Sequence, residues 1–233
     1  MGFFFAPPSG ALANAASNTA AQYHNLWFHV YLPVLGGTFF VVYLVIFFVT
    51  ARYRRRRATV GGFPEQKEEK SHMEILYAVV LACIAGVLYY FLFTTERTID
   101  AVAANPTLKV NVIGYQWQWR FVYPSTNTVV DGKRIGTKFH YPTLVVPQNE
   151  TVQFNLTSRD VVHAFWIPSM RFKRDANPNM INVFDLTFPK AGFFTGRCAE
   201  FCGLYHTLMR FRVLVLPAPK FHRWLESHRG ASL

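Results

Sequence analysis

The sequence predicts a chain of two parts: a hairpin of two transmembrane helices, followed by an all-β sandwich or barrel outside the membrane. Hydrophobic residues make up 51% of the 233 residues and charged residues only 16%, less charge than a soluble domain normally carries. The mean hydropathy is only +0.13, too low for a chain that lies wholly in a bilayer. Two long stretches lack Asp, Glu, Lys and Arg, whereas short apolar runs alternate with turn residues beyond residue 97.

The membrane part is predicted at residues 27–96. Helices are expected at about residues 27–50 and 74–95, because both stretches are apolar and about 20 apolar residues cross a bilayer as a helix. The connecting loop, 51–73, has seven basic and three acidic residues, a net charge of +4, whereas the tail 1–26 has no charged residue. The positive-inside rule places the loop in the cytoplasm and both chain ends outside. An Arg run between two spans argues against a nucleic-acid site.

The outer part is predicted to be one β-domain, residues 97–218, followed by a C-terminal helix and tail at 219–233. Turn residues separate several short runs in which apolar and polar residues alternate, a pattern typical of a sandwich or barrel. The runs lie at residues 109–121, 143–146, 151–157, 161–167, 181–188 and 209–216. Residues 97–233 hold 17 basic and 8 acidic side chains, a net charge of +9. The predicted topology stands, because the positive-inside rule counts short flanking loops and not translocated domains.

One loop between two predicted strands carries four metal-binding side chains: Cys198, Cys202, His206 and Met209. Thiolate, imidazole and thioether together favour copper over hard cations, and two thiolates in one loop can bridge two metal ions. Each metal ion would then need a His, so a second His must come from elsewhere. The strand region offers His140 and His163. His163 is the better candidate because it ends an apolar run, and a metal-binding His is held in a shell that limits solvent.

Other interpretations of this loop are weaker. A disulfide between Cys198 and Cys202 would suit a domain outside the cytoplasm, but it leaves His206 and Met209 unexplained. Structural zinc sites rarely use Met. Cys83 lies in the middle of the second predicted span and is expected to be a small packing residue. The loop therefore predicts a copper site.

Several motifs resemble subunit II of haem–copper cytochrome c oxidases, and the resemblance extends over most of the chain. They comprise the helical hairpin, Gly114-Tyr-Gln-Trp117-Gln-Trp119, Asp160-Val-Val-His163-Ala-Phe-Trp-Ile-Pro168, Lys173-Arg-Asp175-Ala-Asn-Pro178 and the loop from Cys198 to Met209. The loop together with the upstream His is the most specific of these signals. The resemblance implies a cupredoxin-like Greek-key sandwich with a dinuclear, mixed-valence copper centre called CuA.

The resemblance also implies a role for each ligand. Cys198 and Cys202 would bridge the two copper ions, and His163 and His206 would each bind one. Met209 and the backbone carbonyl of Glu200 would be weak ligands, one to each copper. The Glu200 side chain would in addition help to hold a magnesium ion at the contact with subunit I. The haems would lie in that partner subunit.

Three further residues are assigned with the help of the resemblance. Trp117 matches the aromatic residue that receives electrons from the donor. Trp119 is two residues further along the same predicted strand, so its side chain is expected on the same face, where it would extend the aromatic surface. Glu74 stands at the cytoplasmic start of the second span. It is either an ordinary carboxylate at a helix N-terminus or the mouth of a proton-uptake channel shared with subunit I.

The predicted function is that of the electron-accepting subunit of a respiratory oxidase in a bacterial plasma membrane. Because this chain has no acid–base cluster of its own, reduction of O2 to water and proton pumping are assigned to subunit I, and subunit III is a further expected partner. One alternative is the CuA subunit of a haem–copper nitric oxide reductase, and another is a membrane-tethered copper chaperone. A quinol oxidase subunit is disfavoured because those subunits lack the copper ligands that are present here.

The charge of the outer domain bears on the electron donor, which is expected to be a cytochrome c-type protein or a copper protein. Family members that use a soluble basic cytochrome c have an acidic docking surface, whereas this domain has a net charge of +9. Like charges would repel such a donor. We therefore expect a donor with a neutral or acidic face, or one tethered beside the oxidase.

Overall fold

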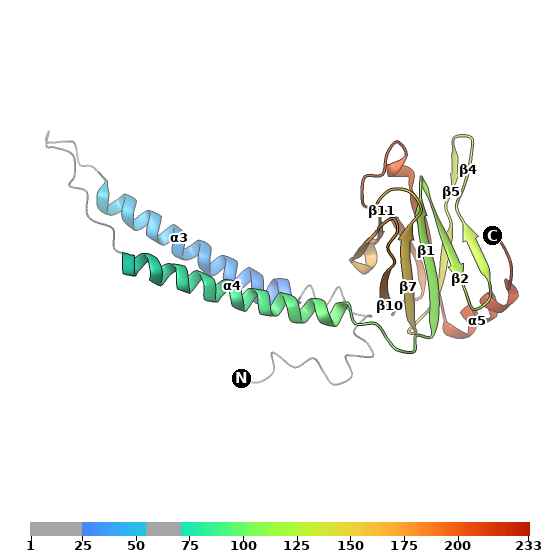
Figure 1. The fold of residues 1–233 in the computed structure, drawn as a ribbon, viewed down its shortest axis with the longest axis horizontal. Coiled ribbons are helices and arrows are strands. Elements are labelled where there is room, and N and C mark those ends of the chain that lie inside the picture. Colours follow the sequence, from blue (N-terminus) through green and yellow to red (C-terminus); the bar gives the residue numbers. More distant parts are fainter. Residues whose placement is uncertain (1–24, 55–70) are drawn as a thin grey trace. The chain divides into compact units, whose positions relative to one another are not determined.

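The computed structural model describes residues 25–54 and 71–233 (Figure 1). Nearly all of the predicted tail 1–26, and most of the predicted Arg-rich loop 51–73, lie outside the described residues. The chain divides into a helical unit that ends at Glu96 and a β unit that begins at Arg97.

The helical unit contains two long helices that are apolar on all sides. A π-helical turn, η2 (Trp27–Tyr31), leads into α3 (Leu32–Tyr53), and α4 runs from Ser71 to Ile99. Pro33 lies in the first turn of α3, directly after the π-helical turn, and membrane helices tolerate such a residue. None of the α3 side chains is buried, and both helices are long and apolar enough to cross a membrane. A helix that is hydrophobic all round needs an apolar environment, which agrees with the two predicted spans.

The β unit is built from two five-stranded sheets. The first has the order β10 (Asn182–Thr187), β7 (Thr151–Ser158), β1 (Leu108–Tyr115), β2 (Gln118–Tyr123) and β3 (Thr128–Asp131). The second has the order β6 (Thr143–Pro147), β12 (Arg210–Leu216), β11 (Gly192–Cys198), β8 (His163–Ile167) and β9 (Phe172–Ala176). A small hairpin of β4 (Lys133–Ile135) and β5 (Lys138–His140) joins neither sheet. Three short helices complete the unit: η3 (Pro168–Met170), η4 (His206–Leu208) and α5 (Ala218–Ser227).

The two sheets enclose one aromatic core. Inward residues alternate with outward ones along β12, where Phe211, Val213 and Val215 are buried. Phe165 and Phe211 stack with their ring centroids 4.7 Å apart. Chain crossings between the sheets produce parallel pairs, β1 with β7 and β12 with β6, among otherwise antiparallel neighbours. The expected fold class, two membrane helices followed by a cupredoxin-like sandwich, is confirmed.

One predicted run differs from the structure in a way that affects the site. Residues 109–121 do not form one strand, because the chain reverses at Gln116 and Trp117 and β2 returns antiparallel to β1, with Tyr115 opposite Gln118. The turn contains no Gly, Pro, Asn or Asp, the residues that normally mark a turn. Apolar alternation continues across it, so nothing in the local sequence indicates the reversal.

Candidate metal centre

The loop between β11 and β12 brings the predicted ligands together. Cys198 is the last residue of β11, and its backbone N–H donates to the Met209 carbonyl at 2.9 Å, which closes the loop at its base. Within the loop, the His206 N–H donates to the Gly203 carbonyl at 3.1 Å, and Gly203 has a φ of +113°, which favours glycine. A further bond, from the Ala199 N–H to the Ala164 carbonyl at 3.1 Å, ties the loop to β8.

The donor atoms of all six predicted ligands form a continuous cluster. The two sulfurs, Cys198 Sγ and Cys202 Sγ, are 3.9 Å apart. Cys198 Sγ lies 3.9 Å from His163 Nδ1 and 3.2 Å from the Glu200 carbonyl oxygen. Cys202 Sγ lies 3.5 Å from His206 Nδ1 and 3.8 Å from Met209 Sδ. Each sulfur is therefore flanked by one imidazole nitrogen and one weaker donor.

His163 comes from β8, in the same sheet as β11, and is fully buried. Its Nε2 is 2.8 Å from Asp160 Oδ1. When Nε2–H donates to this carboxylate, the Nδ1 lone pair is left free towards Cys198. Burial lowers the pKa of His163 below its usual value, although the hydrogen bond and charge of Asp160 oppose the shift. The imidazole is thus kept neutral, the form that binds a metal ion.

The chemistry of this cluster fits copper. Cys198 and Cys202 are both buried free cysteines, so the disulfide interpretation is not supported. Burial, followed by the neighbouring Cys198, raises the pKa of the Cys202 thiol to about 12, because two thiolates side by side repel each other and lack solvent. A bound cation removes that cost. His163, Cys198 and Cys202 place their donor atoms within 4.8 Å of one another, and the thiolate–imidazole–thioether set favours copper.

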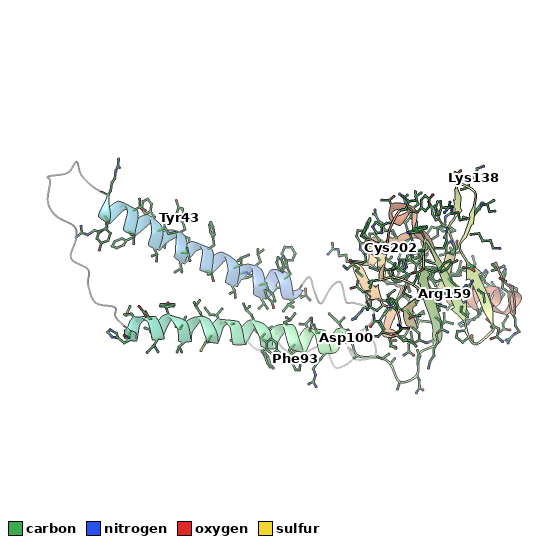
Figure 2. The ribbon with its side chains drawn as sticks, turned by 45° about the horizontal axis from the view of Figure 1, so that its top comes forward. Tyr43, Phe93, Asp100, Lys138, Arg159 and Cys202 are labelled. Atoms are coloured by element: carbon green, nitrogen blue, oxygen red, sulfur yellow. The ribbon has the colours of Figure 1, made fainter. Side chains whose placement is uncertain are left out.

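The turn between β1 and β2 contacts the loop that carries the predicted ligands. Trp117 Nε1 donates to the Cys202 carbonyl at 3.0 Å, and Gln116 Nε2 donates to the same oxygen at 2.8 Å. The Gln116 backbone N–H donates to Asp160 Oδ2 at 2.7 Å. One turn therefore contacts the backbone of one cysteine ligand directly, and reaches the ligand His163 through Asp160. Cys202 lies among closely packed side chains of the β unit (Figure 2).

The expectation for Trp119 is wrong as regards exposure. Trp119 is fully buried in the core, with its ring centroid 6.1 Å from that of His163, so it cannot form a surface with Trp117. The physical reason is the reversal at residues 116 and 117, which ends the alternation that would have placed both indoles on one face. Trp117 is only partly buried and contacts Tyr205 edge-on at 4.9 Å.

Sequence reasoning missed three residues that the structure places around the ligands: Gln116, Asp160 and Tyr205. All three lie within motifs already singled out, but no spacing rule predicts hydrogen bonds between residues 44 or 86 positions apart. The Glu200 side chain is exposed, and Glu74 is exposed in the first turn of α4. Their predicted roles in binding magnesium and carrying protons stay predictions.

The fold and the cluster define a class of protein: a membrane-anchored β-sandwich with a buried copper-type ligand loop. Comparison with known proteins gives the particular family. The family model described as cytochrome C oxidase subunit II, periplasmic domain, matches residues 108–215. Cytochrome c oxidase subunit 2 of Corynebacterium glutamicum is 26% identical, over 94% of this chain and 78% of that protein.

A second relative is closer in sequence. Probable cytochrome c oxidase subunit 2 of Streptomyces avermitilis is 30% identical, over 94% of this chain and 79% of that protein. Among solved structures, the periplasmic domain of cytochrome oxidase subunit II from Bradyrhizobium japonicum is 29% identical, with a TM-score of 0.49 over 55% of this chain and 96% of that one. The chain belongs to the cytochrome c oxidase subunit II family and is a subunit of a haem–copper oxidase complex.

Proposed function

We propose that this chain receives electrons for its oxidase through a dinuclear copper centre, CuA, bound by His163, Cys198, Glu200, Cys202, His206 and Met209. The observation that carries the proposal is the pairing of donors around two adjacent sulfurs, each with one imidazole nitrogen and one weaker donor within 3.9 Å. When bound, the centre supplies one-electron transfer, with the electron shared by two copper ions.

The surrounding protein holds the ligand side chains in place and keeps water away from them. The loop is closed by backbone hydrogen bonds at its base, and His163, Cys198, Cys202 and Met209 are all buried. Ligands held in this way move little when the charge of the site changes, and water does not have to reorganise around them. Small rearrangement favours fast electron transfer over substrate turnover, which fits the assignment of oxygen chemistry to subunit I.

Trp117 is the residue that we propose to receive electrons from the donor. Its indole N–H donates to the Cys202 carbonyl, so its ring system is one hydrogen bond from the backbone of a bridging ligand. The ring is partly exposed and can touch a protein that docks beside it. The expected donor is a cytochrome c-type or copper protein with a neutral or acidic face, soluble or tethered.

The remaining assignments are supported by the positive-inside rule and by the family resemblance. We propose that the loop 51–73 is cytoplasmic, and that the domain 97–218 and both termini are extracytoplasmic in a bacterial plasma membrane. Subunit I would hold the haems, reduce O2 to water and pump protons, with subunit III alongside. Glu200 would contribute to a magnesium site against subunit I, and Glu74 to a proton channel.

A cysteine substitution in the whole oxidase tests the proposal. Cys202→Ser removes one bridging sulfur, whereas Cys83→Ser makes the same change on α4, outside the cluster. Stopped-flow oxidation of a reduced cytochrome c-type donor should lose its fast phase with Cys202→Ser and keep it with Cys83→Ser. An undiminished fast phase with Cys202→Ser, in a complex that still contains this chain, would contradict the role.

A further inference from the structure

The β4–β5 hairpin forms a cationic projection of the β unit. Residues 132–141 contain Lys133, Arg134, Lys138 and His140 but no Asp or Glu. The hairpin extends past the end of the two five-stranded sheets, away from α5 (Figure 1), and Lys138 lies at its tip (Figure 2). All four of these side chains are exposed. Residues 133–140 are called the basic arm below.

The basic arm contacts the loop that carries the metal ligands. The Arg134 guanidinium carbon lies 4.4 Å from the ring centroid of Tyr205, and Phe139 packs against the same ring at 5.6 Å. Tyr205 in turn contacts Trp117 at 4.9 Å. The arm is therefore separated by one aromatic ring from the residue proposed to receive electrons.

The charges of the arm are not neutralised within the part of the chain that the structure describes. No ion pair there involves Lys133, Arg134 or Lys138. Asp131, two residues before Lys133, is already bound by Arg120 and by the Tyr115 hydroxyl. The arm thus presents uncompensated positive charge to solvent.

Large apolar side chains are exposed close by. Leu204 and Phe201, in the same loop as Tyr205, are 78% and 79% exposed, and Ile135 on the arm is 65% exposed. Interfaces between proteins commonly combine an apolar centre with a charged rim. Charge in the rim increases the rate of encounter and sets the orientation of the partner.

We propose that the basic arm is the docking element for an acidic electron-donor protein, whose negative face pairs with Lys133, Arg134 and Lys138 while its redox edge meets Trp117. This inference rests on the proposed function. The inference goes beyond the proposed function because it assigns the choice of donor to one hairpin and not to the net charge of the domain. Tyr205 links the arm to Trp117, because Arg134 and Phe139 contact the Tyr205 ring and this ring contacts Trp117.

The test uses the intact oxidase and charge reversal at the arm. The variant is Lys133→Glu with Lys138→Glu, which leaves the Arg134–Tyr205 contact in place. The matched control is Lys220→Glu with Arg223→Glu on α5, an equal change of charge at exposed positions of the same domain. Each enzyme oxidises an acidic soluble cytochrome c, a basic soluble cytochrome c, or the small reductant N,N,N′,N′-tetramethyl-p-phenylenediamine at low salt.

The arm variant should raise the KM for the acidic cytochrome about tenfold, weaken its salt dependence and lower the KM for the basic cytochrome, as expected when a steering charge is reversed. The α5 control should change neither KM. Equal effects of the two variants would overturn the inference, since only net charge would then matter. The inference would also be overturned if the arm variant lost binding to anionic lipid vesicles while neither KM changed. If the unmodified enzyme did not oxidise the small reductant, that result would instead contradict the proposed function.

Discussion

At the scale of single residues, Asp160 is the group outside the ligand set with the most connections to the site. It accepts hydrogen bonds from His163 Nε2, from the Gln116 backbone N–H and from the Val161 backbone N–H, at 2.7–2.8 Å. Burial alone would raise the pKa of Asp160, but these hydrogen bonds hold it below its usual value. The carboxylate is therefore charged while it accepts the hydrogen bond from the His163 N–H, which increases electron density at that imidazole ring.

Asp160→Asn tests this electrostatic role. Asn keeps the shape and one acceptor oxygen but removes the negative charge, so the oxidised, more positive form of the centre is less stabilised. We expect the reduction potential to rise by on the order of 50 mV, the scale of one partly screened charge near the site. Redox titration of the copper-loaded chain measures the shift, with Glu226→Gln on α5 as a control. An unchanged or lower potential would contradict the account.

The residues of the site differ in how far the sequence predicts them. The ligand loop was predictable because four donors fall within twelve positions, and His163 because the apolar run around it limited the choice. Asp160, Gln116 and Tyr205 were not, because their roles depend on contacts that only the folded sheets create. Trp119 was misplaced for a related reason, since alternation along a strand says nothing about an unmarked turn.

At the scale of elements, Tyr123 joins the two sheets. Its hydroxyl, at the end of β2, donates to the Val145 carbonyl and accepts from the Val145 N–H of β6, both at 2.8 Å. β6 is an edge strand whose neighbour in its sheet is β12, so the hydroxyl satisfies backbone groups on the open side. Burial raises the pKa of Tyr123 above its usual value, which keeps the phenol protonated and able to donate.

Tyr123→Phe removes both hydrogen bonds and leaves a buried N–H and C=O without partners. The expected loss is about 1–3 kcal/mol of unfolding free energy, the usual cost of unsatisfied buried polar groups. Urea unfolding of the purified chain in detergent, followed by tryptophan fluorescence, measures it. Tyr141→Phe is the control, because no hydrogen bond of the Tyr141 hydroxyl is recorded among the described residues. A Tyr123→Phe variant as stable as this control would contradict the role of Tyr123 in joining the sheets.

Elements of the fold were predictable where composition alone decides them. Two long apolar stretches without charge predicted helices long enough to cross a membrane, and alternation identified the longer strands β7 and β12. The strands β3, β4, β5, β9 and β11 were missed. Three to five residues do not establish a period, and β11 reads Gly-Phe-Phe-Thr-Gly-Arg-Cys, without a regular apolar alternation. The hairpin that became the basic arm was among them, so its position beside Tyr205 could not be inferred from its Lys and Arg content.

At the scale of the whole molecule, membrane anchoring and ligand binding lie in different parts of the chain. Two apolar helices anchor the chain in the membrane, and a sandwich with an aromatic core holds a loop of soft ligands in a dry environment. The net charge of +11 combines +4 in the predicted cytoplasmic loop, +9 in residues 97–233, and −2 from Glu74 and Glu96 of α4. Everything proposed about electron flow depends on the loop binding two copper ions and not one.

Copper content combined with electron paramagnetic resonance of the purified full-length chain distinguishes a site for two copper ions from a site for one. The chain is reduced to free thiols, loaded with copper, and freed of excess metal. We expect two copper ions per chain and a hyperfine pattern in which one unpaired electron is shared equally by both. One copper ion with the spectrum of a single blue-copper site, or no copper with Cys198 and Cys202 joined in a disulfide, would contradict this expectation.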